Sequence, residues 1–252
     1  MQLNVKQVGS GPPVVLIHGL FGSLENLAGI ARKLGEHYCV YSLDLPNHGR
    51  SPHTDTTSLA LLADAVYHWQ QKQAFSHASF IGHSLGGKVV MELALSYPRL
   101  VDKLAVLDIA PVHYEPHHNT VFDGLLALKL EQLSNRAEAD GALAKHVAEP
   151  AVRSFLLKNL AKQPQGYGWR MNLATLHNSY PKLVSGNRAD GCFRGKTLFL
   201  KGANSNYIEA QHRGQILSLF PSAQVKVVAD TGHWLHADKP DLVARLLLRF
   251  LS

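Results

Sequence analysis

Cysteine is scarce in this chain of 252 residues, which contains only Cys39 and Cys192. With two cysteines we expect no disulfide framework, and a reducing, cytoplasmic setting. No run of about 18 apolar residues occurs, which argues against stable membrane insertion. The first residues are polar and lack the apolar stretch of a signal peptide. With 46% hydrophobic and 17% charged residues, the composition is that of an ordinary globular protein.

The chain also lacks the marks of nucleic-acid and metal binding. Its formal net charge is +6, but the basic residues are scattered and not interleaved with aromatic ones, so no nucleic-acid partner is expected. The excess indicates general solubility or a mild attraction for anionic acyl carriers or phospholipid surfaces. His113, His117 and His118 lie close together without completing a metal-ligand spacing, and a solvated loop is expected there. We predict no metal, and the oligomeric state stays open.

Short apolar runs alternate with helical periodicities along the chain. Strands are expected at residues 14–17, 40–43, 78–82, 104–107, 197–200 and 225–228. Strands that alternate with helices predict a doubly wound, mostly parallel α/β sheet. One crossover needs only about 20 residues, so the long interval after residue 107 predicts an inserted helical cap. We assign residues 1–111 and 187–252 to the core and 112–186 to the cap, with cap helices expected at 121–133, 136–147, 152–160 and 169–180.

The strand expected at residues 78–82 ends in a sharp-turn motif. Residues 82–86 read Gly-His-Ser-Leu-Gly, which matches G-x-S-x-G, and a helix is expected from residue 85 onward. This turn holds a serine in strained geometry, and the flanking glycines remove side chains that would collide there. Ser84 is therefore the predicted nucleophile, with the helix N-terminus aimed at the developing oxyanion. The alternative is a structural turn with an idle serine.

Two other strand ends supply partners for Ser84. Residues 18–22 read His-Gly-Leu-Phe-Gly after a buried strand, and they provide a backbone N–H for an oxyanion hole or form only a tight turn. Leu20 is the first choice for that N–H and Phe21 the second, and Leu85 is the expected partner. His233 follows the last strand, as the order Ser–Asp–His requires, so it is the predicted base. His236 is a competitor that falls towards the following helix.

These motifs resemble the α/β-hydrolase superfamily, and within it most of all the YbfF-type bacterial acyl esterases. The resemblance runs nearly end to end and is weakest across the cap. It is carried by residues 18–23, 44–51, 82–88, 108–111 and 232–234. It implies a cytoplasmic, cofactor-free serine esterase or thioesterase that acts on small acyl esters through an acyl-enzyme on Ser84, with acyl-CoA as one candidate substrate. It also implies that the loop at 44–51 is structural, although Asn47 replaces the more usual glycine.

The acid of the triad departs from the superfamily pattern. Members often carry an aspartate three residues after a glycine that ends the penultimate strand, but Ser205 stands there after Gly202. The other place is the end of the strand beside the nucleophile strand, where Asp108 stands. Asp108 is therefore the predicted acid, and a structural aspartate that caps the turn is the alternative. Asp190 and Asp230 are lesser candidates.

The cap is rich in large apolar side chains and should cover the rim of the sheet. We predict substrate contacts from Phe21, Phe122 and Trp169. Serine at position 84 argues against a dehalogenase or an epoxide hydrolase, which need aspartate there. Two other readings stay open: a cofactor-free haloperoxidase-like side activity on the same triad, and a hydrolase-fold protein whose cap merely holds a ligand.

Overall fold

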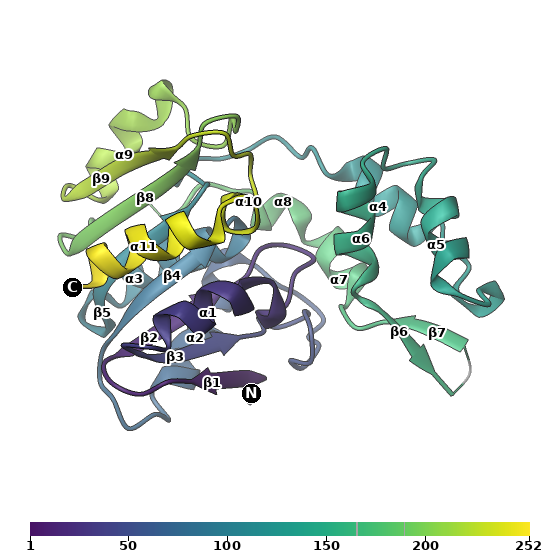
Figure 1. Ribbon diagram of the computed structural model, residues 1–252, viewed down its shortest axis with the longest axis horizontal. Coiled ribbons are helices and arrows are strands. Elements are labelled where there is room, and N and C mark those ends of the chain that lie inside the picture. The colour runs from purple at the N-terminus through teal and green to yellow at the C-terminus, as the bar shows by residue number, and fades with distance from the viewer. Residues whose placement is uncertain (165, 189) are drawn as a thin grey trace.

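Seven strands form one sheet in the computed structural model, which describes residues 1–164, 166–188 and 190–252. Their order is β1-β3-β2-β4-β5-β8-β9 (Figure 1). β1 is antiparallel to β3 and the other neighbouring pairs are parallel, so the predicted α/β sheet is confirmed. The strands are β1 (Val5–Val8), β2 (Pro13–Ile17), β3 (Cys39–Leu43), β4 (Ala78–His83), β5 (Val101–Leu107), β8 (Lys196–Gly202) and β9 (Ala223–Val228).

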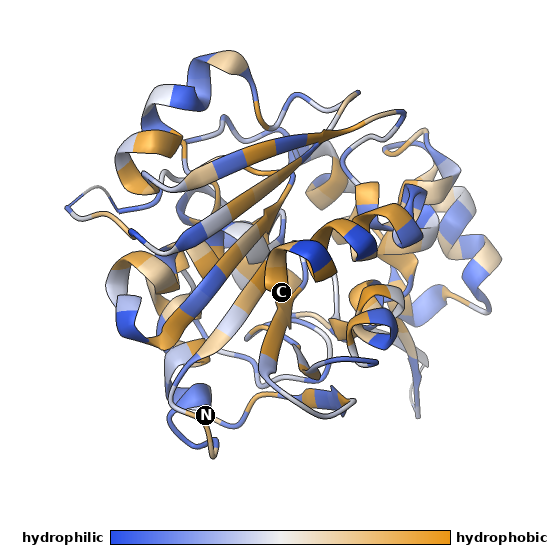
Figure 2. Cartoon of the chain, turned by 60° about the vertical axis from the view of Figure 1, so that its left-hand side comes forward, coloured by the Kyte–Doolittle hydropathy of each residue, from blue (hydrophilic) through white to orange (hydrophobic). Residues whose placement is uncertain are grey.

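Helices cover both faces of the sheet because successive strand side chains point to opposite sides. Val15 and Ile17 of β2 belong to the core beneath α2 and α3, whereas Val14 and Leu16 belong to the core beneath α1 and α11. Hydrophobic residues accordingly run along the strands in Figure 2. The core helices are η1 (Leu24–Leu27), α1 (Ala28–Leu34), α2 (Leu59–Gln70), α3 (Leu85–Ser96), η2 (Pro98–Leu100), η4 (Ala210–His212), α9 (Arg213–Leu219), α10 (Leu235–Asp238) and α11 (Pro240–Leu251).

The chain order of the strands reverses beside β2. From β2 the chain adds β3 on one side, and then β4, β5, β8 and β9 follow on the other. In open α/β sheets a crevice forms at such a point, outside the carboxyl ends of the strands. The loop after β2 and the turn after β4 meet at this crevice, which is where the sequence motifs fall.

The segment between β5 and β8 lies to one side of the sheet (Figure 1). Its elements are α4 (Asn119–Leu126), η3 (Leu130–Gln132), α5 (Arg136–Leu143), α6 (Pro150–Leu157), β6 (Leu160–Gln163), β7 (Gly166–Trp169), α7 (Leu173–Asn178) and α8 (Tyr180–Leu183). The expectation of helices alone was wrong here. β6 and β7 pair as an antiparallel hairpin, and Trp169 ends a strand instead of beginning a helix. The boundaries of the cap at 112 and 186 stay a prediction.

None of the described helices has the length and apolar character needed to cross a membrane.

Candidate active site

Ser84 occupies the turn between β4 and α3 in a conformation that few residues adopt. Its φ is 54° and its ψ is −118°, which costs a non-glycine residue about 1–3 kcal/mol. The neighbouring glycines make the turn sterically possible. A Cβ on Gly82 would lie 2.2 Å from the carbonyl oxygen of Gly86, and one on Gly86 would lie 2.3 Å from that of Ile17. The local sequence therefore holds Ser84 in a strained backbone conformation at the tip of the turn.

Backbone N–H groups gather beside Ser84. Leu85 is the first residue of α3, and the N–H groups of a helix's first turn have no acceptor within the helix. The loop after β2 comes close from the other side, since a Cβ on Gly19 would lie 3.2 Å from the Cβ of Ser84. Leu20 follows directly and, like Ser84, lines the adjoining cavity. The structure thus brings the predicted oxyanion donors, Leu20 and Leu85, to the predicted nucleophile.

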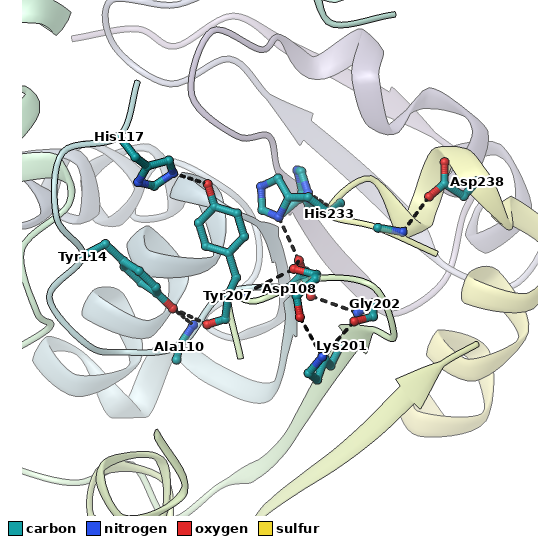
Figure 3. Close-up of polar contacts among 12 residues, drawn as sticks. Asp108, Ala110, Tyr114, His117, Lys201, Gly202, Tyr207, His233 and Asp238 are labelled. Carbon is teal, nitrogen blue, oxygen red and sulfur yellow. Dashed lines mark hydrogen bonds and ion pairs between the residues drawn. The ribbon is translucent and has the colours of Figure 1, made fainter. Parts of the chain in front are cut away.

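Asp108 and His233 are joined by a hydrogen bond at the same rim (Figure 3). His233 Nδ1 donates to Asp108 Oδ2 at 2.8 Å. The Asp108 side chain is fully buried, and an unpaired buried carboxylate would be very costly. Two further donors stabilise it: the N–H of Gly202 bonds Oδ1 at 2.9 Å, and the hydroxyl of Ser205 donates to Oδ2. Ser205, which stands after β8 where the superfamily usually has its acid, thus contacts the carboxylate that follows β5.

Two further histidines surround His233. His83 Nε2 donates to the carbonyl oxygen of His233 at 2.9 Å, so the residue before Ser84 also fixes the loop of the predicted base. His236 packs against His83, with ring centroids 4.3 Å apart. Burial is the main cause that lowers both pKa values, well below normal for His83 and to about 4 for His236. Both rings are therefore neutral at pH 7, and His236 forms no hydrogen bond or ion pair with Asp108 in the described structure.

Comparison with known proteins agrees with this geometry. A model of the alpha/beta hydrolase fold family matches residues 12–240. This chain belongs to that family. Esterase YbfF of Escherichia coli is 36% identical over 258 residues, covering 100% of both chains. The sn-1-specific diacylglycerol lipase ABHD11 of Xenopus laevis is 39% identical over 242 residues, covering 91% of this chain and 76% of its own. A solved marine microorganism esterase superposes with a TM-score of 0.96 at 33% identity, covering 99% of each chain.

These full-length similarities make this α/β hydrolase a carboxylic ester hydrolase of the esterase/lipase type, as the sequence predicted.

The α/β hydrolase has a cavity of about 570 Å³ in front of Ser84, which we call the Ser84 cavity. Core and cap residues line it together. Of the predicted substrate contacts, Phe21 lines it. Phe122 is fully buried and packs edge-on against Phe21, and neither Phe122 nor Trp169 lies among the lining residues. Phe155 of α6 lines the cavity instead, as do His118, Val121, Val152, Tyr207 and Trp234.

Tyr207 is a site residue that the sequence did not reveal. Its ring stacks on that of His233, with centroids 4.1 Å apart and planes 26° apart. Its hydroxyl lies 2.6 Å from Nε2 of His117, and its carbonyl accepts a hydrogen bond from the hydroxyl of Tyr114 (Figure 3). Nδ1 of His117 faces a carbonyl oxygen and must donate to it, and in that tautomer Nε2 accepts from the hydroxyl of Tyr207. The contacts with His117 and Tyr114 join residues 90 and 93 positions apart in sequence.

The expectation of a solvated histidine loop at 113–118 holds for His113 and His117, which are exposed, but was wrong for His118, which is half-buried. His117 bonds Tyr207, and Nδ1 of His118 lies 2.5 Å from the hydroxyl of Tyr180. Burial is the main cause that lowers the pKa of His118, to about 3. Both histidines thus form part of the wall beside Ser84.

The lesser acid candidates lie elsewhere. Asp190 pairs with Arg188, and Asp230, which is 86% exposed, pairs with Lys239. Within the described residues, neither forms a hydrogen bond or ion pair with His233. Among residues 1–164, 166–188 and 190–252, no group of three or more His, Cys, Asp or Glu side chains is arranged to hold a metal ion.

Proposed function

We propose that Ser84, His233 and Asp108 hydrolyse small acyl esters and thioesters, acyl-CoA among the candidates, through an acyl-enzyme. One observation carries this proposal: the hydrogen bond between His233 and a buried Asp108 at the rim where the strained turn presents Ser84. The bond leaves Nε2 of the neutral imidazole free to accept a proton. The two neighbouring oxyanion donors support the same reading.

In the first half of the reaction His233 takes the proton of Ser84 as its oxygen attacks the carbonyl carbon. Charge develops on the carbonyl oxygen, where the N–H groups of Leu20 and Leu85 stabilise it. Asp108 stabilises the imidazolium. His233 then protonates the departing alcohol or thiol, and the acyl group remains on Ser84.

In the second half His233 removes a proton from water, which attacks the acyl-enzyme and releases the acid. Tyr207 limits the rotation of the imidazole by stacking on it, and His83 holds its backbone. The size of the Ser84 cavity accommodates ester and thioester substrates with substantial groups on either side of the carbonyl.

Replacement of the nucleophile tests the proposal. Ser84→Ala should remain folded and lose on the order of a million-fold in kcat with p-nitrophenyl butyrate, because removal of a triad serine typically costs that much. The parent should be labelled by a fluorophosphonate and the variant should not. Activity of the variant within tenfold of the parent would contradict the proposal, and a parent that neither turns over nor is labelled would indicate a ligand-binding protein.

A further inference from the structure

A second cavity adjoins the Ser84 cavity at the junction of core and cap. It has a volume of about 290 Å³, and we call it the polar cavity. Its wall is built from β1, the loops after β2 and β3, and the cap near α6 and β7. Five residues line both cavities: Phe21, Glu25, Asn26, Phe155 and Lys158. The two cavities are therefore adjacent and share part of their wall.

Four cationic side chains line the polar cavity from both parts of the fold. Lys6 and Arg50 belong to the core, and Lys158 and Arg170 belong to the segment between β5 and β8. All four are exposed. Within the described residues, none of their side-chain nitrogens forms an ion pair with a carboxylate. They are therefore available to an incoming ligand.

Two carboxylates in the same wall compensate only part of this charge. Asp44 is 2% exposed, and its oxygens already accept hydrogen bonds from the side-chain amide of Asn4 and the N–H groups of Leu24 and Arg50. Glu25 is the exposed carboxylate, at the part of the wall shared with the Ser84 cavity. A concave site with this excess of positive charge concentrates anions. Arginine also recognises phosphate and carboxylate groups through two parallel N–H donors.

We propose that the polar cavity binds an anionic group, a phosphate or a carboxylate, that the substrate carries away from its scissile bond. This inference rests on the proposed function, because it places the rest of the substrate at Ser84. A phosphate would belong to the leaving group, as in a phosphate-bearing thiol or alcohol. A carboxylate would stand at the far end of the acyl chain.

The experiment compares Arg50→Gln/Arg170→Gln with a matched control, Arg99→Gln/Arg213→Gln. The control arginines are also exposed, form no ion pair within the described residues and line neither cavity. Three substrates are used: neutral p-nitrophenyl butyrate, mono-p-nitrophenyl adipate with a terminal carboxylate, and butyryl-CoA with phosphates in the leaving group. The measured quantity is kcat/KM for each anionic substrate divided by that for the neutral ester.

We expect this ratio to fall about tenfold or more in the cavity variant for one anionic substrate, mainly through KM, and to stay unchanged in the control. Added salt should lower the same ratio in the parent because it screens exposed charges. A fall for adipate alone assigns the anion to the acyl chain, and a fall for butyryl-CoA alone assigns it to the leaving group. A ratio that moves for neither substrate, or equally in the control, overturns the inference. A parent inactive on all three overturns the proposed function itself.

Discussion

At the scale of single residues, the contrast between Asp108 and Ser205 is the sharpest test of the site. Asp108→Asn should lower kcat by a factor on the order of 10⁴, because the amide favours the wrong tautomer of His233. Ser205→Ala should cost far less, since Gly202 and His233 still donate to the carboxylate. Steady-state turnover of p-nitrophenyl butyrate measures both, with Asp190→Asn as the control. Retention of more than a tenth of the activity by Asp108→Asn would move the acid elsewhere.

Sequence motifs predicted the residues whose chemistry depends on their immediate neighbours. Ser84 needs glycines two positions away, and His233 needs only a strand end before it, so both can be recognised locally. The sequence showed Ser205 only as the absence of an acid. No neighbouring residue indicates that its hydroxyl donates a hydrogen bond to Asp108, 97 positions earlier. Tyr207 and its contact with His117 were missed for the same reason: these contacts exist only after the strands are ordered.

At the scale of elements, α6 should influence which acyl chains are accepted. Phe155→Ala removes an aromatic wall of the Ser84 cavity, whereas Trp169→Ala changes a half-buried hairpin residue outside that wall. One buried methylene is worth about 0.8 kcal/mol, close to fourfold in binding. Phe155→Ala should therefore alter kcat/KM unequally across p-nitrophenyl esters from acetate to decanoate, and Trp169→Ala should not. A uniform change with Phe155→Ala would exclude this helix from the substrate wall.

Lys88 connects the nucleophile helix to both ends of the cap segment. Its ammonium donates to the carbonyl oxygens of Val112 at 2.6 Å and Ser185 at 2.7 Å, and burial is the main cause that lowers its pKa to about 7. Lys88→Met should leave the buried carbonyl of Val112 and the half-buried carbonyl of Ser185 without this donor, and destabilise the protein by about 1–3 kcal/mol. Urea unfolding measures this, with exposed Lys72→Met as the control. Equal midpoints for the two variants would show that this connection contributes nothing.

The hairpin β6–β7 shows where the prediction of elements failed. Its strands have four residues each, and residues 166 and 168 are glycines, so no alternating apolar pattern marks them. The helical periodicity of the flanking residues therefore led to a prediction of helices alone in this interval. The central strands were predictable because burial on both sides requires continuous apolar runs, and a small hairpin outside the main sheet is under no such requirement.

At the scale of the whole molecule, buried histidines should make stability depend on pH. Among the described residues, burial lowers the pKa values of five histidines, and each folded value lies below the unfolded value of about 6.5. The unfolded chain therefore binds more protons below pH 6.5, and stability present above that pH is lost as the pH falls. The loss is roughly 1 kcal/mol per pH unit for each histidine. The five histidines with lowered pKa values are His18, His48, His83, His118 and His236.

Urea unfolding at pH 7.5 and pH 5.5 measures this dependence. The midpoint should be clearly lower at pH 5.5. In the parent, burial is the main cause that lowers the pKa of His48 to about 3, so this histidine gains a proton only on unfolding. His48→Gln should therefore reduce the number of protons taken up on unfolding at pH 5.5 by about one, and stability should depend less steeply on pH. The same midpoint at both pH values would show that these rings gain protons without unfolding.

Ser205 and His233 donate to the same oxygen of Asp108, so the ends of β5 and β8 present their side chains to one point. A carboxylate at the end of β8 would lie close to the imidazole of His233, which now donates a hydrogen bond to Asp108. Both carboxylates together would repel each other in a buried place, so natural selection cannot readily duplicate the acid before moving it. A lineage that changes the acid's strand is expected to pass through forms with one carboxylate and a hydroxyl at the other strand end. Among descendants of one ancestor, aspartates at 108 and 205 should exclude each other.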